Sequence, residues 1–105
     1  MNIGTQDTSA SLTATGTTQA TALLLFNGLN FIGTVASGTG VLLFPGDVGT
    51  SQTVYNAGAN ALKVYPTSGA KINGLTTNGA MLLAPNTAVH FWNVTSTQTV
   101  GILSA

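Results

Sequence analysis

Short runs of β-forming and apolar residues recur along this chain, and glycine, asparagine or proline separates one run from the next. The spacing of roughly ten residues is typical of an all-β sandwich or barrel. No window carries a sustained 3.6-residue apolar period with helix caps. We therefore expect a small antiparallel β-sandwich or jelly-roll-like barrel of about eight short strands, with little or no helix. The expected strands are 21–26, 30–35, 41–44, 52–56, 62–65, 80–84, 88–94 and 97–103.

The clearest local pattern lies in residues 52–75, which read QTVYNAGANALKVYPTSGAKINGL. Residues 52–56 and 62–65 are rich in β-forming residues, and 57–60 supply glycine and asparagine, which tolerate positive φ. A strand, a short turn and a second strand predict an antiparallel hairpin. Pro66 ends the second strand because it has no N–H to donate. The turns at Asn73-Gly74, Asn78-Gly79 and Pro85-Asn86 would follow.

Charge is the most restrictive feature of the composition. The 105 residues are enough for one domain, and cysteine is absent. Only 4% of residues are charged, against about 25% in an ordinary soluble domain, and the formal net charge is zero. The charged residues are Asp7, Asp47, Lys63 and Lys71. Such a chain has no basic patch for nucleic acid or for an anionic membrane surface.

The scarcity of charge also bears on assembly. Sheet proteins usually protect their edge strands with lysine or inward-pointing charge, and two lysines must serve every edge here. Either the sheet closes on itself as a monomeric barrel, or neighbouring subunits cover its edges. The neutral surface removes repulsion between copies and favours the second alternative, a homo-oligomer.

The N-terminal segment 1–19 is polar and rich in threonine and serine, with Ile3 and Leu12 as its apolar side chains. We expect it to be either disordered or an extended arm laid on another molecule, and residues 20–105 to form a single β domain. The run 23–26 is apolar on both faces, which predicts a strand covered on both sides. The N-terminus lacks the basic and apolar regions of a signal peptide, and the longest apolar run is too short to span a bilayer.

No constellation of residues indicates catalysis. Asp7 and Asp47 lie far apart in the sequence, and no third group is available to tune them. His90 is the single histidine, whereas zinc needs at least three protein ligands. We therefore expect no enzymatic activity, no metal and no cofactor. His90 is expected to be a half-buried strand residue with a local hydrogen bond, and the alternative is an interface contact or pH-sensitive joint.

Three aromatic side chains carry a polar group: Tyr55, Tyr65 and Trp92. Such residues occur at sugar-binding platforms and in protein interfaces alike. Core or interface packing and glycan binding are both compatible with this pattern.

The run VYNAGANALKVYPTSGAKINGL, residues 54–75, resembles a pattern in small virion proteins of tailed bacteriophages. The segment NGAMLLAP at 78–85 and the pair Phe91-Trp92 continue the likeness, which covers roughly the C-terminal two-thirds of the chain. The resemblance implies a head decoration (cement) or fibre-associated subunit, commonly a β-rich trimer, and it implies no catalytic residues.

Together these features predict a non-enzymatic capsid decoration protein that stabilises a phage head as an oligomer, expected to be a trimer. It would be made in the host cytoplasm and bind the major capsid protein on the outer surface of the virion. The alternative is a receptor- or glycan-binding β module of a tail or fibre. The candidate assembly contacts are Ile3, Leu12, Leu23, Leu25, His90 and Trp92.

Overall fold

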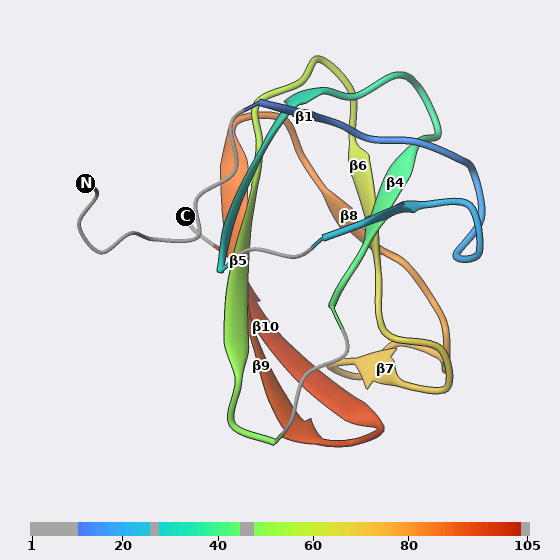
Figure 1. The fold of residues 1–105 in the computed structure, drawn as a ribbon, viewed down its shortest axis with the longest axis vertical. Coiled ribbons are helices and arrows are strands. Elements are labelled where there is room, and N and C mark those ends of the chain that lie inside the picture. The colour runs from blue at the N-terminus through green and yellow to red at the C-terminus, as the bar shows by residue number, and fades with distance from the viewer. Residues whose placement is uncertain (1–10, 26–27, 45–47, 104–105) are drawn as a thin grey trace.

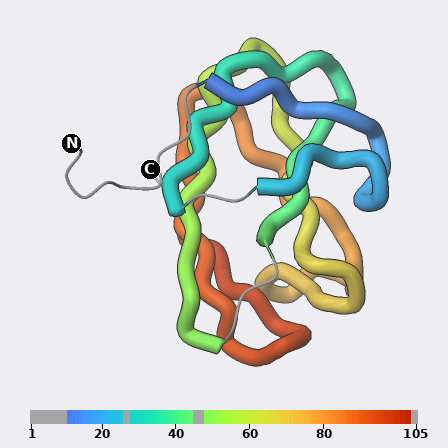
Figure 2. Tube along the Cα trace, in the orientation of Figure 1, coloured from blue at the N-terminus to red at the C-terminus, as the bar shows by residue number. Residues whose placement is uncertain are grey.

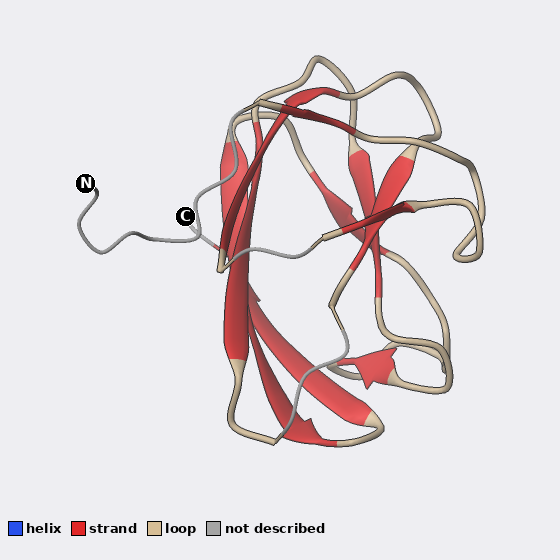
Figure 3. Ribbon diagram, in the orientation of Figure 1, coloured by secondary structure: helices blue, strands red, loops and turns tan. Residues whose placement is uncertain are grey.

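Ten strands in two sheets make up the part of the protein that the computed structural model describes, which is residues 11–25, 28–44 and 48–103 (Figures 1 and 3). No helix occurs in these residues, so the all-β prediction is confirmed there. The strands are β1 Leu12–Thr13, β2 Leu23–Leu24, β3 Leu29–Thr34, β4 Gly40–Leu42, β5 Ser51–Asn56, β6 Leu62–Tyr65, β7 Lys71–Ile72, β8 Met81–Leu83, β9 Thr87–Thr95 and β10 Gln98–Leu103. The six-stranded sheet has the order β1-β3-β5-β9-β10-β7, and the four-stranded sheet has the order β2-β4-β6-β8.

The first six strands wind as a coil. The chain alternates between the two sheets at each step, so β1, β3 and β5 run parallel in one sheet, and β2, β4 and β6 run parallel in the other (Figure 2). Parallel neighbours need a crossover between them, and the crossover here is a strand of the opposite sheet. This connectivity is that of a β-solenoid. The prediction of an antiparallel sandwich or jelly roll was wrong in its strand pairing, because each sheet contains both parallel and antiparallel pairs of strands.

The direction of the chain reverses after β6. The chain passes through β7 at the far edge of the six-stranded sheet, and β8 then pairs antiparallel with β6. β9 pairs antiparallel with β5, and β10 returns beside β9 as a hairpin. Along β9 the predicted alternation is confirmed, since Val89 and Phe91 are buried while His90 and Trp92 lie on the opposite face.

The predicted hairpin between residues 52–56 and 62–65 does not form, although both strands do. β5 and β6 belong to different sheets, because the turn between them carries the chain out of the plane of its sheet. Asn56, fully buried, holds this bend: its Nδ2 donates to the carbonyl oxygens of Asn60 and Leu83, both at 2.9 Å, and its Oδ1 accepts from the Gly58 N–H. These bonds replace the ladder that a hairpin would have made.

The other turns agree better with the sequence. Asn73, Asn78 and Asn86 have φ of 50°, 63° and 62°, and each lies in a turn that its Asn-Gly or Pro-Asn dipeptide predicted. The strands β1 and β7 were not predicted, because two residues carry no periodicity. The predicted strand 21–26 is shorter in the structure, where β2 comprises Leu23–Leu24.

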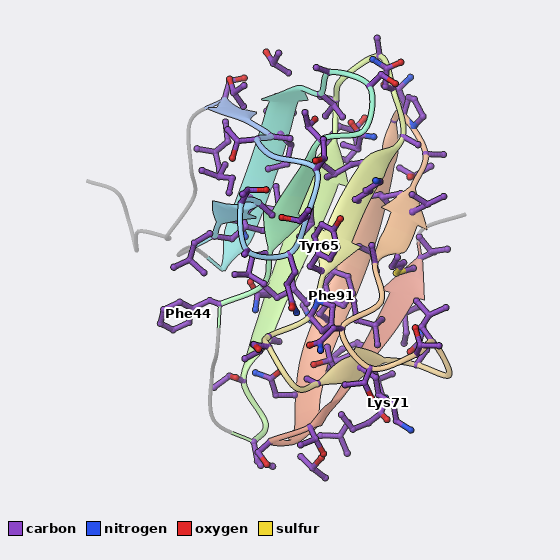
Figure 4. All side chains as sticks on the ribbon, turned by 90° about the vertical axis from the view of Figure 1, so that its right-hand side faces the viewer. Phe44, Tyr65, Lys71 and Phe91 are labelled. Carbon is purple, nitrogen blue, oxygen red and sulfur yellow. The ribbon has the colours of Figure 1, made fainter. Side chains whose placement is uncertain are left out.

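The core lies between the two sheets. It consists of Ala14, Leu25, Ile32, Val35, Val41, Leu43, Val54, Leu62, Val64, Ile72, Leu83, Val89 and Phe91. Figure 4 shows Phe91 within the body of the molecule, whereas Phe44 and Lys71 point outward. Gln52 is also buried, and its side-chain amide exchanges two hydrogen bonds with the backbone of Phe44, at 3.3 and 3.2 Å. Gln52 thus joins β5 to the segment that follows β4, and Asn56 of β5 joins Leu83 of β8, so polar contacts connect the two sheets in addition to apolar packing.

Residues 14–22, here named the covering loop, begin in the core at Ala14 and then lie over the outer side of the four-stranded sheet (Figures 1 and 4). Tyr65, 8% exposed, donates its hydroxyl hydrogen to the Thr17 carbonyl at 3.1 Å. Gln19 Nε2 donates to the Pro66 carbonyl at 2.8 Å and to Asn78 Oδ1 at 3.1 Å. Within the segment 1–19 that we considered as an arm, Thr17 and Gln19 are therefore bonded to the same domain, and residues 1–10 lie outside the described part.

Candidate functional site

The outward side of the six-stranded sheet is the most distinctive surface of the molecule. In a pleated sheet, alternate residues of each strand point to the same side. Four adjacent strands, β3, β5, β9 and β10, contribute to this surface, which we name the outer face. It consists of Leu29, Phe31, Ser51, Thr53, Tyr55, Ala88, His90, Trp92, Val94, Val100 and Ile102.

The register of the strands brings these side chains together in rows. One row runs from Leu29 through Thr53 and His90 to Ile102. The neighbouring row joins Trp92 to a residue on each side, Ser51 on β5 and Val100 on β10. Directly opposed residues lie about 5 Å apart at Cβ, so the rows form one continuous surface.

Large apolar side chains of the outer face are exposed to solvent. The exposed fractions are 43% for Leu29, 42% for Phe31, 37% for Trp92 and 58% for Ile102. Single exposed apolar residues are ordinary, but contiguous apolar patches on soluble monomers rarely exceed a few hundred Å² and often mark interaction sites. These residues share one side of the sheet, with Thr53 and His90 between Leu29 and Ile102, and the outer face is therefore a candidate binding surface.

Ring contacts order the aromatic residues of this surface. Phe31 and Tyr55 stack with their centroids 5.6 Å apart and an interplanar angle of 14°. His90 and Trp92 meet edge to face, with centroids 4.3 Å apart. The His90 Nδ1 is hydrogen-bonded to the Thr53 hydroxyl, which confirms the half-buried strand histidine with a local hydrogen bond. Contacts within the protomer thus hold the aromatic side chains of the outer face in place.

The charged residues that the structure describes, Lys63 and Lys71, are not part of the outer face. None of the residues that make up the outer face is aspartate, glutamate, lysine or arginine. Lys63 lies in β6 of the opposite sheet, and Lys71 lies in β7 at the sheet edge. The outer face is therefore a neutral surface.

The sheet edges are protected in a way that we did not predict. Three of the four edge strands, β1, β2 and β7, have two residues each, and β8 has three. Very short edge strands offer little backbone for pairing, and Lys71 adds charge at one of them. The edges consequently give weaker support for assembly than the outer face does.

The predicted assembly contacts occupy different environments. His90 and Trp92 lie together on the outer face, whereas Leu12 and Leu23 are half-buried and pack against the core. Leu25 is fully buried within the protomer, which leaves it no surface to offer to a second subunit. Ile3 lies outside the described residues.

The sequence did not indicate that Leu29, Phe31, Tyr55, Val100 and Ile102 belong to one surface with His90 and Trp92. The alternation along each strand gives the side on which a residue lies. Only the order of the strands shows which strands are neighbours, and periodicity carries no information on that order.

The described ranges contain neither a cluster of metal-binding side chains nor a membrane-spanning helix. No group of three or more His, Cys, Asp or Glu that could hold a metal ion occurs there. The two aspartates, Asp7 and Asp47, lie outside those ranges. Within them, no helix is long and apolar enough to cross a membrane.

Comparisons with known proteins add nothing to this description: no family model, curated protein or solved structure matches the chain.

Proposed function

We propose that this chain is a non-enzymatic structural protein of a virion, which binds the outer surface of a bacteriophage head and stabilises it as an oligomer. The observation that carries the proposal is the outer face, a neutral surface of exposed aromatic and aliphatic side chains on a regular sheet. Such a surface suits a protein that remains packed against copies or partners. The resemblance of residues 54–75 to virion proteins supports the same class, although Asn56 and Gly58 within it serve the bend of this fold.

The proposed mechanism is mechanical. Each copy adds contacts that must break before the shell opens, and a standard interface buries about 1,600 Å² in total. Because many copies bind one shell, a modest affinity for each contact gives a large stabilisation of the whole shell. Neutral contacts of this kind depend little on salt, since screening acts on charges.

The test is to add the purified protein to heads of its own phage assembled without their decoration protein. We expect saturable binding at symmetric positions, a higher temperature of shell opening, and little change between low and high salt. Absence of binding to the heads, in protein that is folded, would contradict the proposal.

A receptor- or glycan-binding module of a tail or fibre is the second candidate. Trp92 favours it, because the indole is 37% exposed and His90 lies beside it. Tyr65 does not, because it is buried beneath the covering loop. This candidate predicts that Trp92→Ala abolishes binding to host polysaccharide while the domain stays folded. Head binding that survives the same substitution would separate the two functions.

A further inference from the structure

We propose that the outer face of the six-stranded sheet is the contact between copies of this chain, so that the partner covering it is a second copy. The inference rests on the proposed function, in which the chain acts as an oligomer, and it names the surface by which the oligomer is held together.

The outer sides of the two sheets differ in how far they are covered by the chain itself. The covering loop lies on the outer side of the four-stranded sheet and is anchored there by Tyr65 and Gln19. The apolar side chains of the outer face are left 37–58% exposed at Leu29, Phe31, Trp92 and Ile102. Exposed apolar surface of this kind is stabilised when it is removed from water, at about 25 cal/mol per Å².

The neutral outer face of one copy is chemically compatible with the neutral outer face of another. A partner with charged side chains would have to desolvate them against a surface that offers no counter-charge, which is costly. A second copy presents the same neutral face and meets no such penalty. The outer face also has two unlike halves, an aromatic half with Phe31 and Tyr55 on β3 and β5 and an aliphatic half with Val100 and Ile102 on β10. A two-fold rotation can set the aromatic half of one copy on the aliphatic half of the other, as an isologous contact requires.

The outer face is large enough for a contact between two copies. Four strands at about 4.8 Å spacing are roughly 19 Å wide, and strands of six to nine residues are about 20–30 Å long, which gives a footprint of roughly 400–500 Å². Two copies together would bury roughly 800–1,000 Å² of this flat footprint, and the projecting side chains add to that area. The lower bound for a specific interface is about 1,000 Å².

The test compares two lysine substitutions at equally exposed apolar sites. Ile102 is 58% exposed on the outer face, and Leu82 is 63% exposed on β8 of the other sheet. Each substitution is made in the full chain, folding is verified by circular dichroism, and the mass is measured by light scattering coupled to size exclusion over a series of concentrations.

We expect the wild-type protein and Leu82→Lys to be oligomers with the same mass. Ile102→Lys should raise the dissociation constant at least 100-fold, because every contact would bury an unpaired charge. Trp92→Ala adds no charge and should also weaken association. It replaces Ile102→Lys in the measurement if Ile102→Lys does not fold.

Three results would overturn the inference: a wild-type protein that is monomeric at every concentration, an Ile102→Lys or Trp92→Ala oligomer as tight as the wild type, or equal weakening by Leu82→Lys. Binding to undecorated heads is measured separately. An oligomer that depends on Ile102 yet binds no head would refute the proposed function alone. A head-binding oligomer that Ile102→Lys and Trp92→Ala leave intact would refute this inference alone.

Discussion

Asparagine side chains hold several bends and turns of this protein through hydrogen bonds to the backbone. Asn56 and Asn60 hold the bend between β5 and β6, with Asn60 Nδ2 donating to the Val35 carbonyl at 2.8 Å. Asn73 exchanges two hydrogen bonds with the backbone of Gly101 and so extends the pairing beside β10. The sequence indicated that such residues would lie in turns. It did not indicate that Asn56 would be fully buried, because burial depends on β8 lying beside it.

Asn56→Ala is expected to destabilise the fold by about 3 kcal/mol, because it leaves the partners of three hydrogen bonds unsatisfied in or near the core. Asn60→Ala should cost about 1 kcal/mol, since Asn60 is exposed and its side chain makes one hydrogen bond. Urea unfolding of both variants measures the difference, provided that the slopes agree with the wild type. Equal losses would mean that the bend does not depend on the buried amide.

At the scale of elements, the sequence predicted strands well and their partners poorly. Eight strands were expected close to their observed positions, including β9 with its buried Val89 and Phe91. The pairing of residues 52–56 with 62–65 was wrong, because a run of turn residues can join two strands of one sheet or lead from one sheet to the other. The deciding interactions, from Asn56 to Leu83 and from Asn60 to Val35, are distant in sequence.

The covering loop supplies a prediction at this scale. Tyr65→Phe removes the hydroxyl that donates to the Thr17 carbonyl and should lower the stability by about 1 kcal/mol. The substitution should also speed amide hydrogen exchange in residues 14–22, because this contact holds the loop to the sheet.

Tyr55→Phe is the matched control. The Tyr55 hydroxyl has no hydrogen bond to another described residue, and its ring stacks on Phe31 in either form. Unchanged exchange of residues 14–22 in Tyr65→Phe would show that the loop is held by other contacts, such as those of Gln19.

At the scale of the whole molecule, the coil and its reversal produce the candidate site. Three turns of the coil place β3 beside β5, and the reversal then adds β9 and β10 to the same sheet. Sequence reasoning identified His90 and Trp92 and the neutrality of the surface. It could not show which strands share the outer face, because strands recur at the same interval along the sequence in a sandwich and in a coil. The neighbours of β9, which are β5 and β10, follow from the reversal of the chain after β6.

The most direct measurement uses Trp92, which is the single tryptophan of the chain and lies on the outer face. Its fluorescence reports whether that face is in contact with water. We would record the emission maximum and the quenching by acrylamide across a dilution series, with the mass measured in parallel.

If copies meet through the outer face, the emission shifts to longer wavelength and quenching increases over the same concentrations at which the mass falls. High salt should leave these concentrations nearly unchanged. An oligomer that dissociates while the emission and quenching of Trp92 stay constant would contradict the account, because the outer face would then be equally exposed in both states.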